Sequence, residues 1–213
     1  MEPARDKVGI SGDADQQHGK GSRPRSLASI GKNVIKQEAK GLQALSEKID
    51  RHFEEAVGLL NVPGMVIFTG VGKSGHVGKK LAATFVSLGI RSTFIHPTEA
   101  AHGDLGLLRP GDAIVALSRS GKAIELISIL SRKSQCPVVL ISENDKESLA
   151  AFADVVLKLP KVAEAWGHAP TTSTVMQMAM GDALAIALTS VNGFTEEDFK
   201  ATHPGGVLGH GKG

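Results

Sequence analysis

The stretch MVIFTGVGKSGHVGKKLAATFVSLG, residues 65–89, contains the patterns that determine the fold of this chain. It begins with an apolar run, MVIFT, which is typical of a fully buried strand. The glycine-rich sequence GVGKSG (70–75) follows, and its glycines permit a tight turn. From Val77 to Leu88 apolar residues then recur every three or four positions, which indicates a helix. The stretch therefore predicts a strand, a turn and a helix.

The same alternation continues toward the C-terminus. A helical pattern runs through Ile124, Ile127 and Leu130, and a long helix is predicted over about 172–191. Fully apolar strands that alternate with helices indicate a parallel sheet covered on both faces. We therefore predict an α/β fold with a five-stranded parallel sheet flanked by helices, in which the other strands are residues 92–96, 113–118, 138–142 and 154–159.

The N-terminal part of the chain contains two different segments. Residues 1–24 are rich in Gly, Asp, Gln, Arg and Lys and have no hydrophobic period, so we expect a disordered tail there and the folded domain over 25–213. After the tail, one apolar helix face is predicted from six residues at spacings of three and four: Leu42, Leu45, Ile49, Phe53, Val57 and Leu60.

Composition narrows the classes of function. The chain has 213 residues, of which 41% are hydrophobic and 22% charged, as in an ordinary globular domain. A net charge of +2 and a 4% share of aromatic residues give no support to nucleic-acid binding. No apolar run reaches the roughly 18–20 residues of a membrane span, and the N-terminus lacks the apolar core of a signal peptide. We therefore expect a cytoplasmic protein with no nucleic-acid or membrane partner.

Polar residues cluster directly after the predicted strands. HPTEAAHGD (96–104) follows the second strand, SRSGK (118–122) follows the third, and APTTST (169–174) follows the fifth after a longer loop. In a parallel sheet flanked by helices, ligands bind beyond the carboxyl ends of the strands. These segments and GVGKSG are therefore predicted to share one site at this edge of the sheet.

Hydroxyl groups at helix starts indicate the type of ligand. GVGKSG alone could be only a tight turn, because it has the spacing of neither a P-loop nor a dinucleotide-binding fingerprint. The start of a helix, however, offers free N–H groups and a positive dipole end to an anion. Ser118, Ser120 and the hydroxyls of 171–174 are more than helix capping requires. Three such helix starts predict a site for a phosphate monoester, and without a nucleotide motif the expected ligand is a small sugar phosphate.

Five segments together resemble a known family. Over residues 30–209 the chain contains, in order, GVGKSGHVGKKLAATFVSLG, FIHPTEAAHGDLG, ALSRSGKAIEL, APTTST and THPGG. This series resembles the sugar isomerase (SIS) domain of arabinose-5-phosphate isomerases of the KpsF/GutQ type. The resemblance implies interconversion of D-arabinose 5-phosphate and D-ribulose 5-phosphate through an enediol, for Kdo and lipopolysaccharide biosynthesis. It also implies a flavodoxin-like sheet, a homotetramer and no required cofactor.

The resemblance assigns functions to single residues. Five positions match functional positions of the family, and we expect them to be catalytic: Lys73, His102, Glu125, Glu164 and His203. Around them, the substrate is expected to contact Gly72, Ser74, Gly75, Glu99, Ser118, Ser120, Gly121, Thr171, Thr172, Ser173 and Thr174. The chemistry needs a base that moves a proton between C1 and C2, a proton donor to the carbonyl oxygen, and a group that stabilises the enediolate.

Individual roles combine this chemistry with the resemblance. Glu125 and Glu99 are both candidates for the base, and the sequence does not rank them. Lys73 is expected to hold the phosphate or the enediolate. His203 is the candidate acid or base for ring opening, and in the family it can reach the site of a neighbouring subunit. His96 matches a position that can hold an inhibitory zinc ion, and a simple strand-end histidine is the alternative.

The chain departs from the family pattern at three places. The two CBS modules that usually follow are not present up to Gly213, so we expect either a shortened chain or a stand-alone SIS enzyme. The loop EAWGHAPTTST (164–174) is shorter by two residues than the family's, and SRSGKA (118–123) replaces the more usual SNSGES. Two other functions remain open, namely a non-catalytic SIS module that senses a sugar phosphate and an isomerase of another phosphosugar.

Overall fold

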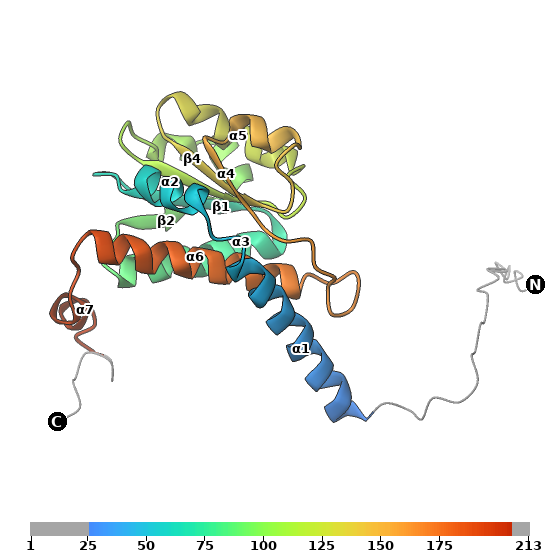
Figure 1. The fold of residues 1–213 in the computed structure, drawn as a ribbon. Helices are drawn as coiled ribbons and strands as arrows, with labels where there is room; N and C mark the ends of the chain where they lie inside the picture. Colours follow the sequence, from blue (N-terminus) through green and yellow to red (C-terminus); the bar gives the residue numbers. More distant parts are fainter. Residues whose placement is uncertain (1–25, 206–213) are drawn as a thin grey trace, which may run out of the picture.

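The sheet has five strands, all parallel, in the order β2-β1-β3-β4-β5 (Figure 1). The computed structural model describes residues 26–205, so the tail predicted over 1–24 lies outside the described residues. The strand order is flavodoxin-like, and it confirms the predicted five-stranded parallel sheet. The strands are β1 (Val66–Gly70), β2 (Ser92–Phe94), β3 (Ala113–Leu117), β4 (Val138–Ser142) and β5 (Val155–Lys158).

Helices cover both faces of the sheet (Figure 1). On one side lie α1 (Leu27–Ser46), α2 (Arg51–Leu60), α3 (Gly72–Ser87) and α6 (Thr172–Val191). The other side is covered by α4 (Pro97–Ala101), α5 (Ile127–Leu130) and the 3₁₀-helices η1 (Asp104–Leu107), η2 (Ile124–Leu126) and η4 (Ser148–Phe152). Two further short helices complete the described chain: η3 (Ser131–Ser134) after α5, and α7 (Glu196–Thr202) after α6.

The strands supply two separate apolar cores, because successive side chains in a strand point to opposite faces. Phe68 belongs to the core under α3 and α6, whereas the adjacent Ile67 belongs to the core under α5. Phe68 packs edge-on against Phe85 of α3, with ring centroids 4.8 Å apart. Every residue of β1, β3 and β4 is buried, which explains their continuous apolar runs.

The six apolar residues between positions 42 and 60 lie on two helices and, for the exposed Ile49, in the turn between them, so the prediction of one helix face was wrong. α1 ends and α2 begins within residues 46–51. Asp50 caps α2, since its carboxylate accepts the backbone N–H of His52 at 2.9 Å. The spacing of apolar residues continues across the break because both helices turn their apolar sides toward the same core.

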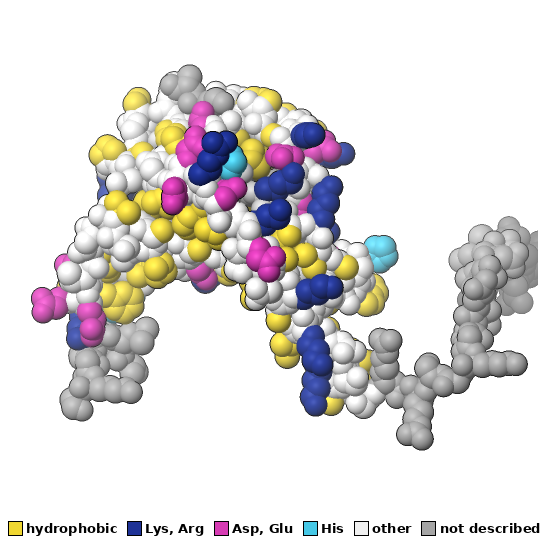
Figure 2. Space-filling model, viewed as in Figure 1, with side chains coloured by type: hydrophobic (Ala, Val, Ile, Leu, Met, Phe, Trp, Pro, Cys, Tyr) yellow, Lys and Arg dark blue, Asp and Glu magenta, His cyan; other side chains and the backbone are white. Residues whose placement is uncertain are grey.

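α1 is an amphipathic helix that projects from the body of the domain (Figure 1). Its fully buried residues are Gly41 and Leu45, near its C-terminal end. Lys32, Lys36 and Lys40 recur every four residues and therefore share one side of α1. Figure 2 shows dark blue side chains along the projecting helix. Apolar side chains remain exposed along its N-terminal half: Leu27, Ile30 and Ile35. The described chain thus leaves part of the apolar side of α1 uncovered.

α6 is the central helix on its side of the sheet, and it confirms the helix predicted over 172–191. Among the described residues it is the one helix long and apolar enough to span a membrane by length and composition. Its packing accounts for this composition, because it contacts α1, α2 and α3 and buries Met176, Met180, Leu184 and Leu188.

Replacing Gly181 of α6 by Ala is expected to destabilise the protein. A Cβ atom at Gly181 would lie 2.3 Å from Cδ1 of Leu81, a fully buried residue of α3. Overpacking costs about 1–3 kcal/mol, which exceeds the roughly 1 kcal/mol that Ala gains over Gly in a helix. Gly58→Ala in α2 is the matched control, because a Cβ there meets nothing within 4 Å. Thermal melts should show a lower Tm for the first variant and a higher Tm for the second; shifts of the same sign would contradict this close contact.

Candidate active site

A cavity opens at the carboxyl edge of the sheet, between β1 and β3. The chain continues from β1 to β2 on one side and from β3 to β4 on the other, so this gap is the switch point at which such sheets bind ligands. The cavity has a volume of about 410 Å³, and its walls come from the turn after β1 and the loops after β3 and β4: Val71, Ser74, Leu117, Ser118, Arg119, Ser120, Ala123, Glu143 and Asn144. The fold thus brings the segments GVGKSG and SRSGK together.

The N-terminus of α3 forms the first wall. Gly72 has a φ of +59°, in the left-handed region that favours glycine, and the next residue, Lys73, is exposed. A Cβ at Gly75 would lie 2.7 Å from the carbonyl oxygen of Gly70, so the helix can start this close to the strand only with glycine there. In the described chain no side chain caps this helix, and its first N–H groups can therefore serve an anion.

The loop after β3 leads into short helices. The prediction of one helical segment over 124–130 is corrected, because this region divides into η2 and α5. The apolar residues that suggested a helix are three positions apart, which is the period of a 3₁₀-helix. Glu125 therefore lies on η2, where it is exposed, while Ser118 is buried and Ser120 is exposed at the rim of the cavity.

The start of α6 is occupied by a carboxylate of the protein itself. Oε2 of Glu164 accepts the backbone N–H of Thr171 at 2.8 Å and of Ser173 at 3.2 Å, and the Thr171 hydroxyl at 3.1 Å. The Thr174 hydroxyl donates to the Thr171 carbonyl at 2.7 Å. Thr172 and Ser173 are buried. Glu164 thus takes the place predicted for a phosphate, and in the described chain α3 is the one long helix at this edge whose start is uncapped.

The contacts of Glu164 keep it ionised. Burial alone would raise its pKa, but hydrogen bonds from Ser173 and Thr171 and the charge of Arg119 outweigh burial and lower the pKa of this carboxyl. Nη1 of Arg119 lies 2.9 Å from Oε1 of Glu164. A carboxylate held in this way suits an anchor better than a proton donor near neutral pH. The catalytic role of Glu164 stays a prediction.

Four polar residues of this region were not predicted from the sequence. Glu143 and Asn144 line the cavity directly after β4. The rule that ligands bind beyond the carboxyl ends of parallel strands could have found them. Arg119 lies inside a segment that was noted only for its serines. Gln177 accepts the hydroxyl of Ser74 at 3.1 Å and so joins α6 to α3, but an isolated amide in an apolar helix gives no sequence signal.

The segment after β2 forms α4. Nδ1 of His96 accepts the N–H of Thr98 at 3.3 Å and caps this helix. Glu99 and His102 are exposed, and α4 contacts η2, so the two candidate bases, Glu99 and Glu125, lie on neighbouring elements. Within residues 26–205 no three His, Cys, Asp or Glu side chains gather as a metal site, so zinc binding rests on the single imidazole of His96 and stays a prediction.

His203 lies far from the cavity of its own chain. Its Nε2 is 2.7 Å from Oγ of Ser87, the last residue of α3, and its ring stacks on Phe199 with centroids 4.0 Å apart. α3 starts at the cavity with Gly72, and a rise of 1.5 Å per residue separates its two ends by roughly 22 Å. In this arrangement His203 can reach a switch-point cavity only in a second copy of the chain.

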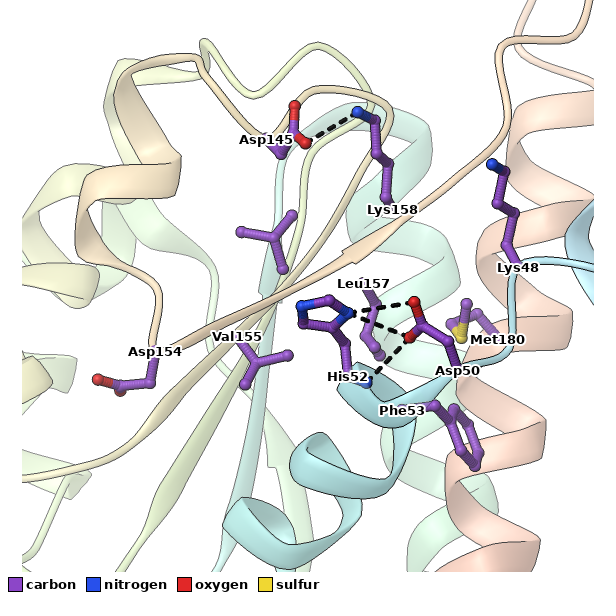
Figure 3. A pocket seen from close by; sticks show the side chains of 11 residues that line it. Lys48, Asp50, His52, Phe53, Asp145, Asp154, Val155, Leu157, Lys158 and Met180 are labelled. Carbon is purple, nitrogen blue, oxygen red and sulfur yellow. Dashed lines mark hydrogen bonds and ion pairs between the residues drawn. The ribbon is translucent and has the colours of Figure 1, made fainter.

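A second cavity, of about 380 Å³, lies along β5 beside the start of α2 (Figure 3). In Figure 3 the imidazole of His52 faces the carboxylate of Asp50, with Nδ1 and Oδ2 3.2 Å apart, and Lys158 reaches Asp145 at 2.8 Å. None of the residues predicted to bind substrate lines this cavity, which lies at the edge strand of the sheet. We therefore place the candidate active site at the switch point.

Comparisons with known proteins give the family. The model of the SIS domain matches residues 59–187 of this chain. The arabinose 5-phosphate isomerase KdsD of Salmonella typhi is 46% identical over 184 residues, which are 84% of this chain and 56% of the relative. KdsD of Escherichia coli K12 is 44% identical and is covered to the same extent. The chain thus spans little more than half the length of these curated relatives.

Solved structures share the fold. The structure of E. coli CFT073 c3406 in complex with arabinose 5-phosphate is 36% identical, with a TM-score of 0.77, and the match covers 86% of this chain and 100% of that chain. Vibrio vulnificus NanR complexed with ManNAc-6P is 21% identical, with a TM-score of 0.71 over 83% of this chain and 66% of that chain, and it shows the fold alone. Because the family model covers more than half of its residues, this chain belongs to the SIS domain family.

Proposed function

We propose that this chain is an isomerase that interconverts D-arabinose 5-phosphate and D-ribulose 5-phosphate. The observation that carries the proposal is the 46% identity to KdsD of S. typhi over 84% of the chain. The E. coli c3406 structure, which is in complex with arabinose 5-phosphate, supports it with a match over 86% of the chain. The cavity at the switch point, with the uncapped start of α3 in its wall, is a suitable place for a phosphate group.

The proposed reaction moves protons between neighbouring carbons. In the open-chain aldose a base removes the proton from C2, the electrons of the C2–H bond form the C1=C2 double bond, and O1 takes up a proton to give the enediol. The O2 hydroxyl then loses its proton as the C2=O2 carbonyl forms, and C1 takes up a proton to give the ketose. No electron leaves the substrate, so a base, an acid and a group that stabilises the enediolate suffice for this chemistry.

The groups that this reaction needs lie on the segments that follow β1, β2 and β3, next to but not among the residues that line the cavity. Glu125 on η2 or Glu99 on α4 serves as the base, His102 contacts the sugar, and Lys73 holds the phosphate or the enediolate. The first N–H groups of α3 and the hydroxyls within 118–120 hold the phosphate. No cofactor is needed in this proposal, and a zinc ion at His96 would inhibit.

The proposed assembly is a cytoplasmic homotetramer, which provides a precursor of Kdo for lipopolysaccharide and needs no nucleic-acid or membrane partner. Two observations support an assembly. The N-terminal half of α1 carries exposed apolar side chains, Leu27, Ile30 and Ile35, which a second copy could cover. His203 lies at the far end of α3 from its own cavity, so its predicted role in ring opening requires the site of another subunit.

A coupled assay tests the proposed function. The protein is incubated with arabinose 5-phosphate, and ketose should appear. In deuterated water the C2 proton of the substrate should also exchange. Binding without exchange would favour a sensor of sugar phosphates, and faster turnover of another phosphosugar would favour an isomerase of that sugar.

Sugar phosphates are expected to raise the Tm of the protein, whereas the corresponding free sugars are not. The reason is that the start of α3 can bind the phosphate only in the folded chain, and a ligand that binds only the folded state stabilises it. Thermal melts with arabinose 5-phosphate and with arabinose at equal concentration measure the difference. Equal shifts with both compounds would contradict a phosphate site.

A further inference from the structure

Arg119 joins three loops at the carboxyl edge of the sheet. Its Nε donates to Oε1 of Glu143 at 2.8 Å, and its Nη1 lies 2.9 Å from Oε1 of Glu164. Its backbone carbonyl accepts the N–H of Glu143 at 3.1 Å and the hydroxyl of Ser142 at 3.3 Å. Hydrogen bonds and an ion pair of this one residue therefore connect the loops after β3, β4 and β5.

The two carboxylates are more buried than the guanidinium that joins them. The side chain of Glu164 is 1% exposed and that of Glu143 is 10% exposed, against 39% for Arg119. A buried carboxylate is stable only when it is paired and hydrogen-bonded. The start of α6 supplies the contacts to Oε2 of Glu164, and Arg119 supplies the positive charge beside Oε1. Loss of Arg119 would therefore leave a buried charge without its cation.

We propose that Arg119 is a positioning residue: by holding Glu143 and Glu164, it fixes the loop after β4 and the start of α6 relative to the phosphate-binding loop after β3. The inference rests on the proposed function, because that function makes these loops the walls of a substrate site. A guanidinium suits the task, since its Nε–H donates a hydrogen bond to Glu143 while Nη1, at a fixed position on the same planar group, pairs by charge with Glu164. A lysine ammonium carries the same charge but lacks this geometry.

The kinetic test uses two variants and a control. Arg119→Gln is expected to lower kcat/KM for arabinose 5-phosphate by about 10-fold or more, because misplaced binding groups reduce the rate steeply. Arg119→Lys should recover part of this loss, because it keeps the charge. Arg91→Gln is the matched control, since Arg91 is exposed just before β2 and its replacement changes the net charge equally. Full activity of Arg119→Gln, or an equal loss in the control, would overturn the proposal.

Thermal unfolding against pH tests the same contacts without any activity. The pKa of Glu164 is lower in the folded chain than its ordinary value, so its contribution to stability is present above that value and is lost as the pH falls through the folded pKa. The Tm deficit of Arg119→Gln relative to wild type should therefore be largest near neutral pH and shrink toward acid pH. A Glu164→Gln background should therefore reduce this pH dependence, whereas a Glu143→Gln background should reduce the size of the deficit, because Glu143 also pairs with Arg119.

The two measurements separate this inference from the proposed function. A Tm deficit that is equal at every pH, and unchanged in both Gln backgrounds, would show that Arg119 does not hold the carboxylates. A wild-type protein that does not isomerise arabinose 5-phosphate would contradict the proposed function, while the melts would still decide the contacts of Arg119. If Arg119→Gln does not fold, both measurements are made on Arg119→Lys. Its Tm deficit relative to wild type should be smaller and should have the same pH dependence.

Discussion

Glu125→Gln is expected to lower kcat for the isomerisation of arabinose 5-phosphate by about 10²-fold or more. Gln keeps the size of the side chain but removes one of the two carboxylates proposed to take the C2 proton, and a general base contributes about 10²–10⁴-fold to the rate. Glu125 is exposed on η2, so its replacement disturbs no buried side chain. Steady-state kinetics and exchange of the C2 proton into deuterated water measure the loss.

Glu99→Gln is the matched variant for this experiment. It makes the same chemical change at an exposed position on α4, which contacts η2. kcat should fall by about 10²-fold in whichever variant lacks the base. Arabinose 5-phosphate should still raise the Tm of both variants, because neither loses the phosphate site. Normal turnover in both would show that neither carboxylate removes the proton.

His203→Ala is also expected to lower kcat by about 10²-fold or more, with the loss confined to ring opening and proton transfer. The structure makes this effect conditional on assembly, because His203 lies at the far end of α3 from the switch-point cavity of its own chain. The substitution also removes a contact to Ser87 and the stacking on Phe199, so a thermal melt must accompany the kinetics. Activity at the wild-type level would exclude His203 from the chemistry.

Mixed oligomers test whether His203 acts across subunits. In a hybrid of Glu125→Gln and His203→Ala subunits, an intact Glu125 of one chain can meet an intact His203 of the other only if the site is shared. Activity should therefore return when the two inactive variants are dissociated and reassembled together. Reassembly into hybrids without any return of activity would contradict a shared site.

The strands could be predicted from the sequence because both of their faces are buried. β1, β3 and β4 pack against helices on each side, and their unbroken apolar runs follow from that burial. The break between α1 and α2 could not be predicted from apolar spacing, because both helices face one core. The local signal for the break is Asp50, whose carboxylate caps α2.

The loops of the candidate site could also be predicted, since parallel strands end at one edge, but their internal contacts could not. The hydroxyl of Thr171 bonds to Glu164, and that contact depends on the path of the loop after β5. The link from Arg119 to Glu143 and Glu164 crosses loops that are distant in the sequence. The resemblance placed His203 in the site, whereas only the geometry shows that it lies at the opposite end of α3.

The pairing of β1 with β3 also determines when the cavity can exist during folding. Val66 pairs with Ala113, and α3, β2 and α4 lie between them in the chain. The chain must lose the entropy of loop closure before two strands so far apart in the sequence can gain any contact, so parallel sheets form slowly. The turn after β1 and the loop after β3 each supply one wall, and neither encloses a ligand alone. We therefore expect a sugar phosphate that binds in this cavity to act mainly by slowing unfolding and to change the rate of folding little.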